Sequence, residues 1–305
     1  MNRMMVALEL TNRCNFRCSY CPHSVYQEPT GRNVYDRPEG DMPRETLEAI
    51  LPNLNPHAKS VTIGFFGEPL LHPNFEEFTD RLHVGRKYAF HLNTNGSLIT
   101  ESLLPTLWKY DTVRISLDAA DKETWERLCP GGRVKTMDGT WGADRWETLT
   151  EKVTALLGVR GRPPIYLIFV TTEETKSTAD RFVEQWQPLL SRKGDKIAIK
   201  TMLSYGGVME NPIIINRRCK VSGEKRLVIS WQGECSPCNL DVNMGLYVGN
   251  ILQTKTFVGV LGSPAYQERM HQIHHRVGLC ANCRDGGNFT FRLVSRNHDP
   301  IRRPC

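Results

Sequence analysis

Three closely spaced cysteines lie near the start of the chain. Cys14, Cys18 and Cys21 follow the pattern C-x3-C-x2-C directly after an apolar run over residues 6–10. Three thiolates on one loop can ligate three irons of a cubane iron–sulfur cluster, which leaves the fourth iron without a protein ligand. A structural zinc site uses four protein ligands, usually as two pairs, and this loop offers three cysteines. The pattern therefore favours an iron–sulfur cluster with one iron open to a substrate or cofactor.

A second group of cysteines lies in the last third of the chain. It follows the pattern C-x13-G-x4-C and, 42 residues later, C-x2-C, formed by Cys219, Cys238, Cys280 and Cys283. Four thiolates saturate a [4Fe–4S] cluster and leave no iron for a substrate, which suits electron transfer or a structural role. A four-cysteine zinc site explains the same spacing equally well. Cys235 lies in the same predicted turn as Cys238 and is an alternative ligand.

The elements that position these cysteines alternate regularly up to about residue 205. Predicted strands cover residues 6–10, 61–66, 89–93, 113–117, 165–171 and 197–202, and predicted helices cover 44–54, 75–85, 101–108, 122–128, 146–157 and 179–190. Such alternation predicts an α/β fold with a parallel sheet covered by helices. Six units are too few for an eightfold barrel, so we predict a partial (β/α)6 TIM-like barrel. Its chemistry should gather at the carboxyl ends of the strands.

Two predicted loops and the end of the strand–helix alternation complete this outline. Residues 22–42 form a predicted loop, and the glycine-bearing segment 130–142 is an insertion that could cap a pocket. The alternation stops after residue 205, and six of the ten cysteines follow. We therefore predict a barrel domain over residues 1–205 and a small auxiliary-cluster domain over residues 206–305.

The composition is that of a globular protein with reduced thiols. Hydrophobic residues make up 40% and charged residues 24% of the 305 positions, which excludes extensive disorder. Ten cysteines are too few for a disulfide scaffold. Residues 1–10 are too short and too interrupted for a signal peptide, and the longest apolar runs are strand-sized, so we expect a cytoplasmic protein without a membrane span. The net charge of +6 suits an anionic partner without requiring one.

The first cysteine loop, residues 12–21 (NRCNFRCSYC), resembles the signature of radical S-adenosylmethionine (SAM) enzymes. The resemblance includes Tyr20, an aromatic residue just before the third cysteine. It implies that Cys14, Cys18 and Cys21 hold a [4Fe–4S] cluster whose open iron is chelated by the amine and carboxylate of SAM. Reductive cleavage of SAM would then release a 5′-deoxyadenosyl radical that abstracts a hydrogen atom from the substrate.

Further segments match this family at the ends of the predicted strands. Gly67, Glu68 and Pro69 resemble its Gly-Gly-Glu-Pro element, which meets the methionyl amine, although Phe66 replaces the first glycine. The resemblance implies that residues at the next two strand ends approach the ribose or carboxylate of SAM. The expected cofactor-binding residues are Tyr20, Gly67, Glu68, Asn95, Ser116 and Asp118. For Asn95 and Asp118 the alternative is simple turn chemistry.

The second cysteine pattern resembles the auxiliary-cluster domain called SPASM, or its shortened form called twitch. A full SPASM domain carries further cysteines after the C-x2-C pair, and only Cys305 remains here, so the one-cluster form fits better. The resemblance implies one auxiliary [4Fe–4S] cluster held by Cys219, Cys238, Cys280 and Cys283. The companion motif near the N-terminus favours iron–sulfur over zinc at this site.

By analogy with relatives that carry a single auxiliary cluster, we expect an oxidoreductase. Hydrogen abstraction beside a hydroxyl or amine, proton loss and electron transfer to the auxiliary cluster would give a two-electron oxidation. No residues are left over for an added peptide-binding module, so we expect a small polar substrate such as a sugar, aminocyclitol or nucleoside. An external low-potential donor, flavodoxin-like or ferredoxin-like, would supply the reducing electron.

Two other functions fit the same residues. A radical epimerase or peptide-modifying enzyme would use a cysteine as hydrogen-atom donor, and Cys129 and Cys235 are the candidates, although each also fits the role of a small buried apolar side chain. A zinc-stapled module that binds nucleic acid through its basic surface is a more distant alternative, because basic and aromatic residues are not interleaved as in nucleic-acid binders.

Overall fold

The computed structural model describes residues 3–23, 35–209, 219, 221, 223–283, 285 and 290–296. The chain divides into two compact units. The first comprises Met1–Cys14, Cys21–Phe90 and Leu203–Asn288, and the second comprises Asn15–Tyr20, His91–Met202 and Phe289–Cys305. Residues 24–34 of the predicted loop 22–42, and Cys305, lie outside the described residues.

The first unit joins the N-terminal strands to the cysteine-rich C-terminal part. Its strands are β1 (Met4–Leu8), β2 (Ala58–Ile63), β7 (Arg226–Ile229), β8 (Glu234–Ser236) and β9 (Gly249–Asn250). Their order is β2-β1-β7-β8-β9, with β1 parallel to both β2 and β7 and with antiparallel pairing onward from β7. Its helices are α1 (Arg44–His57), α2 (Phe75–His83), α7 (Ile251–Thr254), α8 (Phe257–Leu261) and α9 (Pro264–His275), with short 3₁₀ turns η2 (Pro69–Leu71) and η7 (Gly278–Cys280).

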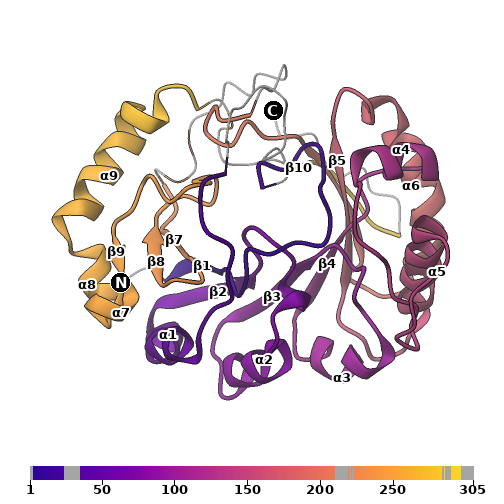
Figure 1. The fold of residues 1–305 in the computed structure, drawn as a ribbon, viewed down its shortest axis with the longest axis horizontal. Helices are drawn as coiled ribbons and strands as arrows, with labels where there is room; N and C mark the ends of the chain where they lie inside the picture. The colour runs from indigo at the N-terminus through magenta and orange to yellow at the C-terminus, as the bar shows by residue number, and fades with distance from the viewer. Residues whose placement is uncertain are drawn as a thin grey trace. The chain divides into compact units, whose positions relative to one another are not determined.

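The second unit continues the strand–helix alternation. Its strands are β3 (Ala89–Thr94), within which the chain enters the unit, β4 (Thr112–Ser116), β5 (Ile165–Thr171), β6 (Lys196–Thr201) and β10 (Thr290–Val294). Strands β3 to β6 are parallel neighbours in sequence order, and β10 pairs antiparallel with β6. The helices are α3 (Leu104–Leu107), α4 (Lys122–Leu128), α5 (Arg145–Gly158) and α6 (Ala179–Trp186), with 3₁₀ turns η3 (Glu101–Leu103), η4 (Lys176–Thr178) and η5 (Gln187–Leu189). Figure 1 shows α4, α5 and α6 on one side of β4 and β5.

All six predicted strands of the alternating region are present, with ends shifted by a few residues. Alternating burial explains them: in β1, Met4, Val6 and Leu8 are buried while the residues between them are half-buried. The sequence pattern did not predict that β7 becomes a second parallel neighbour of β1. This pairing matters because β1 then has hydrogen-bonding partners on both sides, as a central strand requires. No helix in the described parts of the chain is long and apolar enough to span a bilayer.

A buried ion pair connects the residues that precede the amino-terminal ends of β5 and β6. The Arg162 guanidinium donates to both carboxylate oxygens of Asp195, at 2.7 and 2.6 Å, and both side chains are almost completely buried. Asp195 also accepts from the backbone N–H groups of Ile165 and Arg192, each at 2.9 Å. Burial by itself would raise the pKa of Asp195, but these hydrogen bonds bring it below its ordinary value. The carboxylate is therefore charged at neutral pH and fully partnered.

Replacing Arg162 with methionine should lower the free energy of unfolding by about 3–5 kcal/mol, because Asp195 would remain buried without its cation. Urea denaturation of the anaerobically prepared protein measures the change. The matched control is Arg181→Met, which removes an exposed ion pair with Asp121 and should change stability by at most about 1 kcal/mol. Equal effects of the two substitutions would contradict a special contribution from the buried pair.

Candidate functional site

The first three cysteines lie on the loop that follows β1, and each is half-buried. The middle of this loop, Asn15–Tyr20, belongs to the second unit. There the backbone N–H of Arg17 donates to the carbonyl of Pro130, and that of Ser19 donates to the carbonyl of Leu128, both at 2.8 Å. The main chain between the cysteines is therefore held by the end of α4 and the residues that follow it.

The segment 130–142, expected to cap a pocket, packs at its start against this loop. Gly132 has a φ of +64°, and a Cβ atom there would collide with the carbonyl oxygen of Asn15. Glycine is therefore required for the close approach of the two backbones. The Phe16 ring adds an edge-to-face contact with the buried Trp125, at 5.5 Å between ring centres, and Trp125 packs in turn on Trp146.

In the first unit, the turn after β2 packs against the residues that precede Cys14. Gly67 has a φ of +80°, and a Cβ there would lie 2.6 Å from the carbonyl oxygen of Thr11. The backbone N–H of Glu68 donates to the carbonyl of Arg13 at 2.8 Å. The buried Glu68 carboxylate accepts from the N–H of Leu70 at 3.1 Å and so caps the short turn η2. These contacts explain why glycine and glutamate stand at these positions.

Phe66, which departs from the family pattern, joins an apolar cluster. It is buried with Tyr35 and Val242, and the partly buried Cys21 packs against the same cluster. The Tyr35 and Phe66 rings meet edge to face at 5.8 Å. The substitution of phenylalanine for glycine therefore adds apolar surface beside the third cysteine of the loop.

Of the predicted cofactor-binding residues at the strand ends of the second unit, Asn95 bonds directly to the cysteine loop. The Asn95 side chain donates to Asn15 Oδ1 at 2.9 Å and accepts from the backbone N–H of Ser97. Ser116 is the last residue of β4 and is half-buried. Asn95 thus takes part in a turn, as the alternative expectation held, and also contacts the loop.

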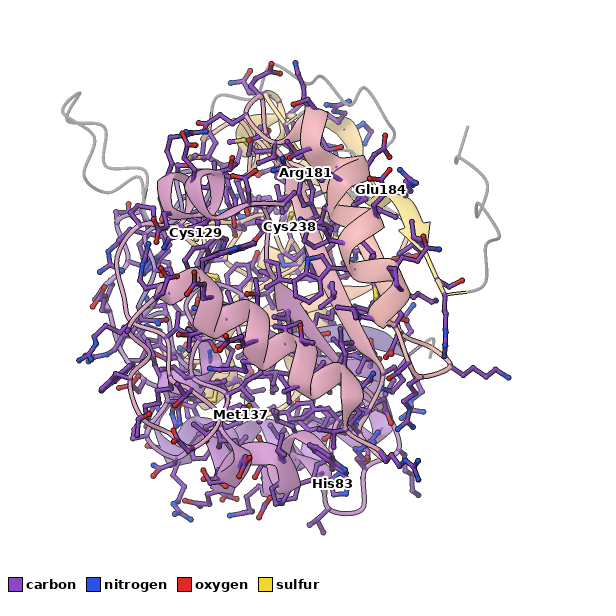
Figure 2. The ribbon with its side chains drawn as sticks, turned by 90° about the vertical axis from the view of Figure 1, so that its right-hand side faces the viewer. His83, Cys129, Met137, Arg181, Glu184 and Cys238 are labelled. Atoms are coloured by element: carbon purple, nitrogen blue, oxygen red, sulfur yellow. The ribbon has the colours of Figure 1, made fainter. Side chains whose placement is uncertain are left out.

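The buried Asp118 is hydrogen-bonded to the half-buried Tyr20. Asp118 has a φ of +61°, and its carboxylate accepts from the Tyr20 hydroxyl at 2.6 Å and from the backbone N–H of Val170 at 2.9 Å. Burial raises the pKa of Asp118 to about 6, although both hydrogen bonds oppose the shift. The Tyr20 hydroxyl also lies 3.8 Å from the Cys129 thiol, and Cys129 is labelled in Figure 2. The pKa of Cys18 is raised, mainly by a hydrogen bond with Cys129 and to a smaller extent by burial. Cys18 therefore lies beside Cys129, and these two residues adjoin Tyr20 and Asp118.

The structure brings the four predicted auxiliary ligands together within the first unit. The Cys238 thiol interacts electrostatically with Cys219 and Cys283, and the Cys280 thiol with the same two residues. Burial is the main cause that raises the pKa of Cys238, Cys280 and Cys283, and it brings that of Cys280 to about 11. Three of these cysteines pack on an apolar cluster of Val221, Leu246 and Ile273. Four thiols beside apolar side chains are a donor set that fits a [4Fe–4S] cluster.

Cys235 is placed differently from Cys238. It lies in β8, paired with Ile229 and Gly249, and its side chain is completely buried. Its thiol donates to the carbonyl of Gly233 at 3.6 Å, and burial raises its pKa to about 12. Of the two alternative ligands, Cys238 is the one that lies with the other three cysteines.

Sequence reasoning missed two aspartates that organise the auxiliary group. Asp285 accepts from the backbone N–H of Ser204 at 2.7 Å and of Gly206 at 3.0 Å, and lies 4.0 Å from the Cys283 thiol. Asp241 accepts from the Ser236 hydroxyl at 2.7 Å and from backbone N–H groups in the loop after Cys238. Their closeness in sequence to the cysteines was the available signal.

The described residues contain neither a site for a single metal ion nor a disulfide. No three histidine, cysteine, aspartate or glutamate side chains among them are arranged to hold a single metal ion. None of the nine described cysteines forms a disulfide.

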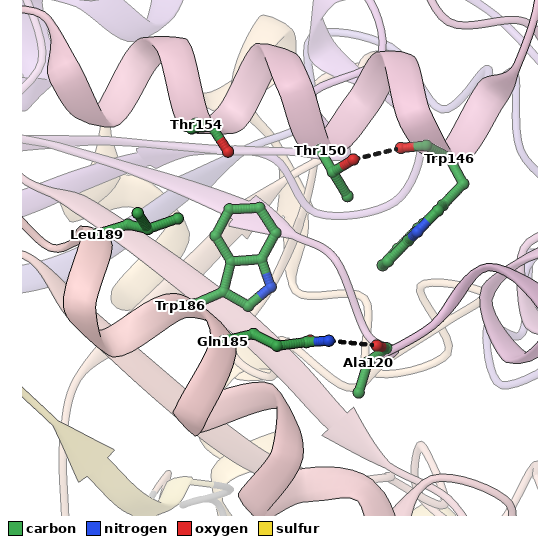
Figure 3. Close-up of a pocket in the computed structure, with 7 residues that line it drawn as sticks. All are labelled: Ala120, Trp146, Thr150, Thr154, Gln185, Trp186 and Leu189. Carbon is green, nitrogen blue, oxygen red and sulfur yellow. Dashed lines mark hydrogen bonds between the residues drawn. The ribbon is translucent and has the colours of Figure 1, made fainter.

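A pocket lies between α5 and α6, and Figure 3 shows the residues that line it. These residues are Ala120, Trp146, Thr150, Thr154, Gln185, Trp186 and Leu189. The pocket includes none of the predicted site residues.

Two family models match the chain. Residues 8–184 match the radical SAM superfamily, and residues 219–284 match an iron–sulfur cluster-binding domain, SPASM. The matches imply a [4Fe–4S] cluster, S-adenosylmethionine and auxiliary iron–sulfur as cofactors. They favour an enzyme over the zinc-stapled nucleic-acid-binding module.

Curated relatives include enzymes and a cofactor-modifying protein. The chain is 32% identical over 272 residues to the tungsten-containing aldehyde ferredoxin oxidoreductase cofactor-modifying protein of Pyrococcus furiosus, covering 76% of this chain and 69% of that protein. It is 29% identical over 109 residues to the S-adenosyl-L-methionine-dependent 2-deoxy-scyllo-inosamine dehydrogenase of Niallia circulans, covering 34% of this chain and 39% of that one.

Solved structures with the same fold cover most of the chain. BtrN in complex with AdoMet and 2-DOIA matches with a TM-score of 0.60 and 20% identity over 99% of this chain and 98% of that one. Streptococcus suis SuiB bound to the precursor peptide SuiA matches with a TM-score of 0.66 and 13% identity over 87% and 66%. The predicted fold class, an α/β partial barrel whose sheet does not close, is confirmed. The protein belongs to the radical SAM superfamily and carries a SPASM iron–sulfur domain.

Proposed function

We propose that this radical SAM enzyme catalyses the two-electron oxidation of a small polar substrate, with the auxiliary cluster as electron acceptor. The observation that carries the proposal is the group formed by Cys219, Cys238, Cys280 and Cys283. A cluster with four thiolate ligands has no iron left for a substrate, so it is suited to electron transfer. Similarity to a dehydrogenase of the same superfamily supports the same reaction class.

In this proposal Cys14, Cys18 and Cys21 hold the catalytic cluster. Bound at its open iron, S-adenosylmethionine supplies the radical that removes a hydrogen atom from the substrate. Gly67 allows the turn after β2 to approach the start of the cysteine loop, and Glu68 caps that turn. Tyr20, Asn95, Ser116 and Asp118 would shape the surface that receives the cofactor.

The oxidation balances as a loss of two electrons and two protons. One hydrogen atom leaves the carbon that bears a hydroxyl or amine, one proton leaves the heteroatom, and one electron passes to the auxiliary cluster. An external low-potential donor of the flavodoxin or ferredoxin type supplies the electron for SAM cleavage. The proposal includes a cytoplasmic location, where such donors are available.

The alternative is a radical epimerase or peptide-modifying enzyme in which a cysteine returns the hydrogen atom. The placement of Cys129, buried beside Tyr20 and Cys18, is the observation that favours it. A structural neighbour bound to a precursor peptide adds support for a peptide substrate. Cys235 is the weaker donor candidate because its thiol is enclosed in the strand pairing of β8.

Isotope transfer from solvent distinguishes oxidation from epimerisation. In D2O, the reduced enzyme supplied with a panel of sugars, aminocyclitols, nucleosides and cysteine-containing peptides should form 5′-deoxyadenosine and a product two hydrogens lighter, with no deuterium at the reacting carbon. Mass spectrometry measures both. The epimerase would be established instead by a product that is an isomer of the substrate and carries one deuterium from the solvent. The Cys129→Ala variant should then fail to incorporate that deuterium.

Iron content tests the assignment of the auxiliary ligands. The reconstituted wild-type protein should hold about eight iron atoms per chain, and the Cys238→Ala variant about four, because a [4Fe–4S] cluster needs its full ligand set. The Cys235→Ala variant is the matched control and should keep about eight. The reverse pattern would show that Cys235 is the ligand.

The Gly67→Ala variant tests whether the turn after β2 must approach the backbone of the residues before Cys14 closely. The added Cβ would collide with the carbonyl of Thr11, so we expect reductive SAM cleavage to fall by about 100-fold. Gly85→Ala is the control, since Gly85 also has a positive φ but has open space around it. Formation of 5′-deoxyadenosine under dithionite is the assay, and equal activity of both variants would contradict the expected role of this turn.

A further inference from the structure

One face of the second unit carries a row of polar side chains at the same level of neighbouring strands. The strand register places Asn93 opposite Arg114, Arg114 opposite Tyr166, and Tyr166 opposite Lys196. All four are half-buried, whereas the residues that alternate with them are buried. Lys200, four residues beyond Lys196 on β6, shares their side of the sheet. We call this surface, formed by Asn93, Arg114, Tyr166, Lys196 and Lys200, the polar face.

The opposite side of the same strands holds the helix-packed core. Phe169 of β5 packs on Phe182 of α6, with 4.8 Å between ring centres, and Leu167, Ile197 and Ile199 are also buried. The polar face is therefore the side of the sheet that does not meet α6. The basic side chains on the polar face therefore do not belong to the solvent-exposed surface of the helix layer.

Positive charge on the polar face is poorly compensated. Burial lowers the pKa of both Arg114 and Lys200, and the like charge of Arg114 also contributes to lowering the pKa of Lys200, to about 8. Within the described residues neither forms an ion pair, and the hydrogen bond of Arg114 to Asn93 is long, at 3.4 Å. Asp118 supplies the opposing charge near Lys200, but its oxygens already accept from Tyr20 and Val170.

Between the two cations the polar face is lined by small or uncharged residues. The next level of the register aligns Ser116, Ile168 and Ala198. Ala198, between Lys196 and Lys200 on the same strand, has a small side chain and carries no charge. Ser116, an expected cofactor-binding residue, lies two positions beyond Arg114, or about 7 Å along β4. A group bound at Arg114 would therefore lie next to the region where the cofactor is expected.

We propose that Arg114 and Lys200 bind an anionic group of the substrate, a carboxylate or a phosphate, on the polar face. Two like charges at half-buried positions without an ion-pair partner destabilise the free protein, and an anion relieves that cost. Arginine presents a planar fork that matches a carboxylate or phosphate, and lysine adds a point charge. This inference rests on the proposed function and deepens it, since the small polar substrate would also be an anion.

Anion binding to the unreduced holoenzyme tests the proposal directly. Inorganic pyrophosphate and malonate serve as phosphate and carboxylate probes in isothermal titration calorimetry. We expect the wild-type protein to bind at least one of them, and the one it prefers identifies the anion. Arg114→Met and Lys200→Met should each weaken binding by about 10- to 100-fold, as expected for loss of a charged hydrogen-bonding partner. Arg160→Met, which removes an exposed arginine after α5, should bind as wild type does.

Three results of the binding experiment would overturn the proposal. The first is that the wild-type protein binds neither probe, and the second is that Arg114→Met binds as tightly as the wild type. The third is that the probes compete with SAM and that Arg114→Met weakens SAM binding equally, which would assign the anion site to the SAM carboxylate. Reductive SAM cleavage, measured separately, reports on the proposed function, so its failure is distinguishable from failure of anion binding.

Thermal stability separates a ligand site from a structural role. Arg114→Met removes repulsion with Lys200, so its melting temperature without ligand should rise above that of the wild type, whereas Arg160→Met should leave it unchanged. A fall in melting temperature in both Arg114→Met and Lys200→Met would show that these cations stabilise the fold and would contradict the proposal.

Discussion

An iron with an open coordination site requires three thiolates and no fourth, so the loop that carries Cys14, Cys18 and Cys21 must be held by groups other than its cysteines. Backbone contacts meet this requirement. Carbonyl groups of Leu128 and Pro130 accept from the loop between the cysteines, and Gly132 allows the close approach. In the first unit, Gly67 lets the turn after β2 reach the residues before Cys14. Short backbone-to-backbone contacts of this kind leave no space for side chains, which explains glycine at both positions.

The auxiliary cysteines obey a different constraint. Burial raises the pKa of the Cys238, Cys280 and Cys283 thiols, and binding of a metal cluster favours their deprotonated form. The surrounding polar groups are satisfied by Asp241 and Asp285, which accept several hydrogen bonds from nearby loops. A saturated, apolar-lined site of this kind is suited to holding electrons rather than substrate. In the proposed function, the two cysteine groups would divide the chemistry between an open iron and a closed cluster.

Charge placement on the second unit adds a third constraint. Stability alone favours partners for buried cations, as Arg162 has in Asp195. Arg114 and Lys200 instead share one side of the sheet, and neither forms an ion pair within the described residues. Asp118, the carboxylate that acts on Lys200, accepts hydrogen bonds from Tyr20 and Val170. An anionic ligand would supply the partner that these cations lack. The contrast between the two arginines is the reason for assigning them different roles.

Much of the chemistry was predictable from local sequence. The spacing of Cys14, Cys18 and Cys21 and the alternation of apolar runs predicted the cluster type and the strands, because ligand spacing and strand periodicity are properties of neighbouring residues. The resemblance of residues 12–21 to a family signature indicated the superfamily. Other features depend on contacts between distant segments. The pairing of β7 with β1, the position of Cys238 rather than Cys235 beside Cys280, and the placement of Arg114 and Lys200 on one side of the sheet arise when segments far apart in sequence align. No local pattern encodes such alignments, because they depend on the register and order in which the whole chain packs.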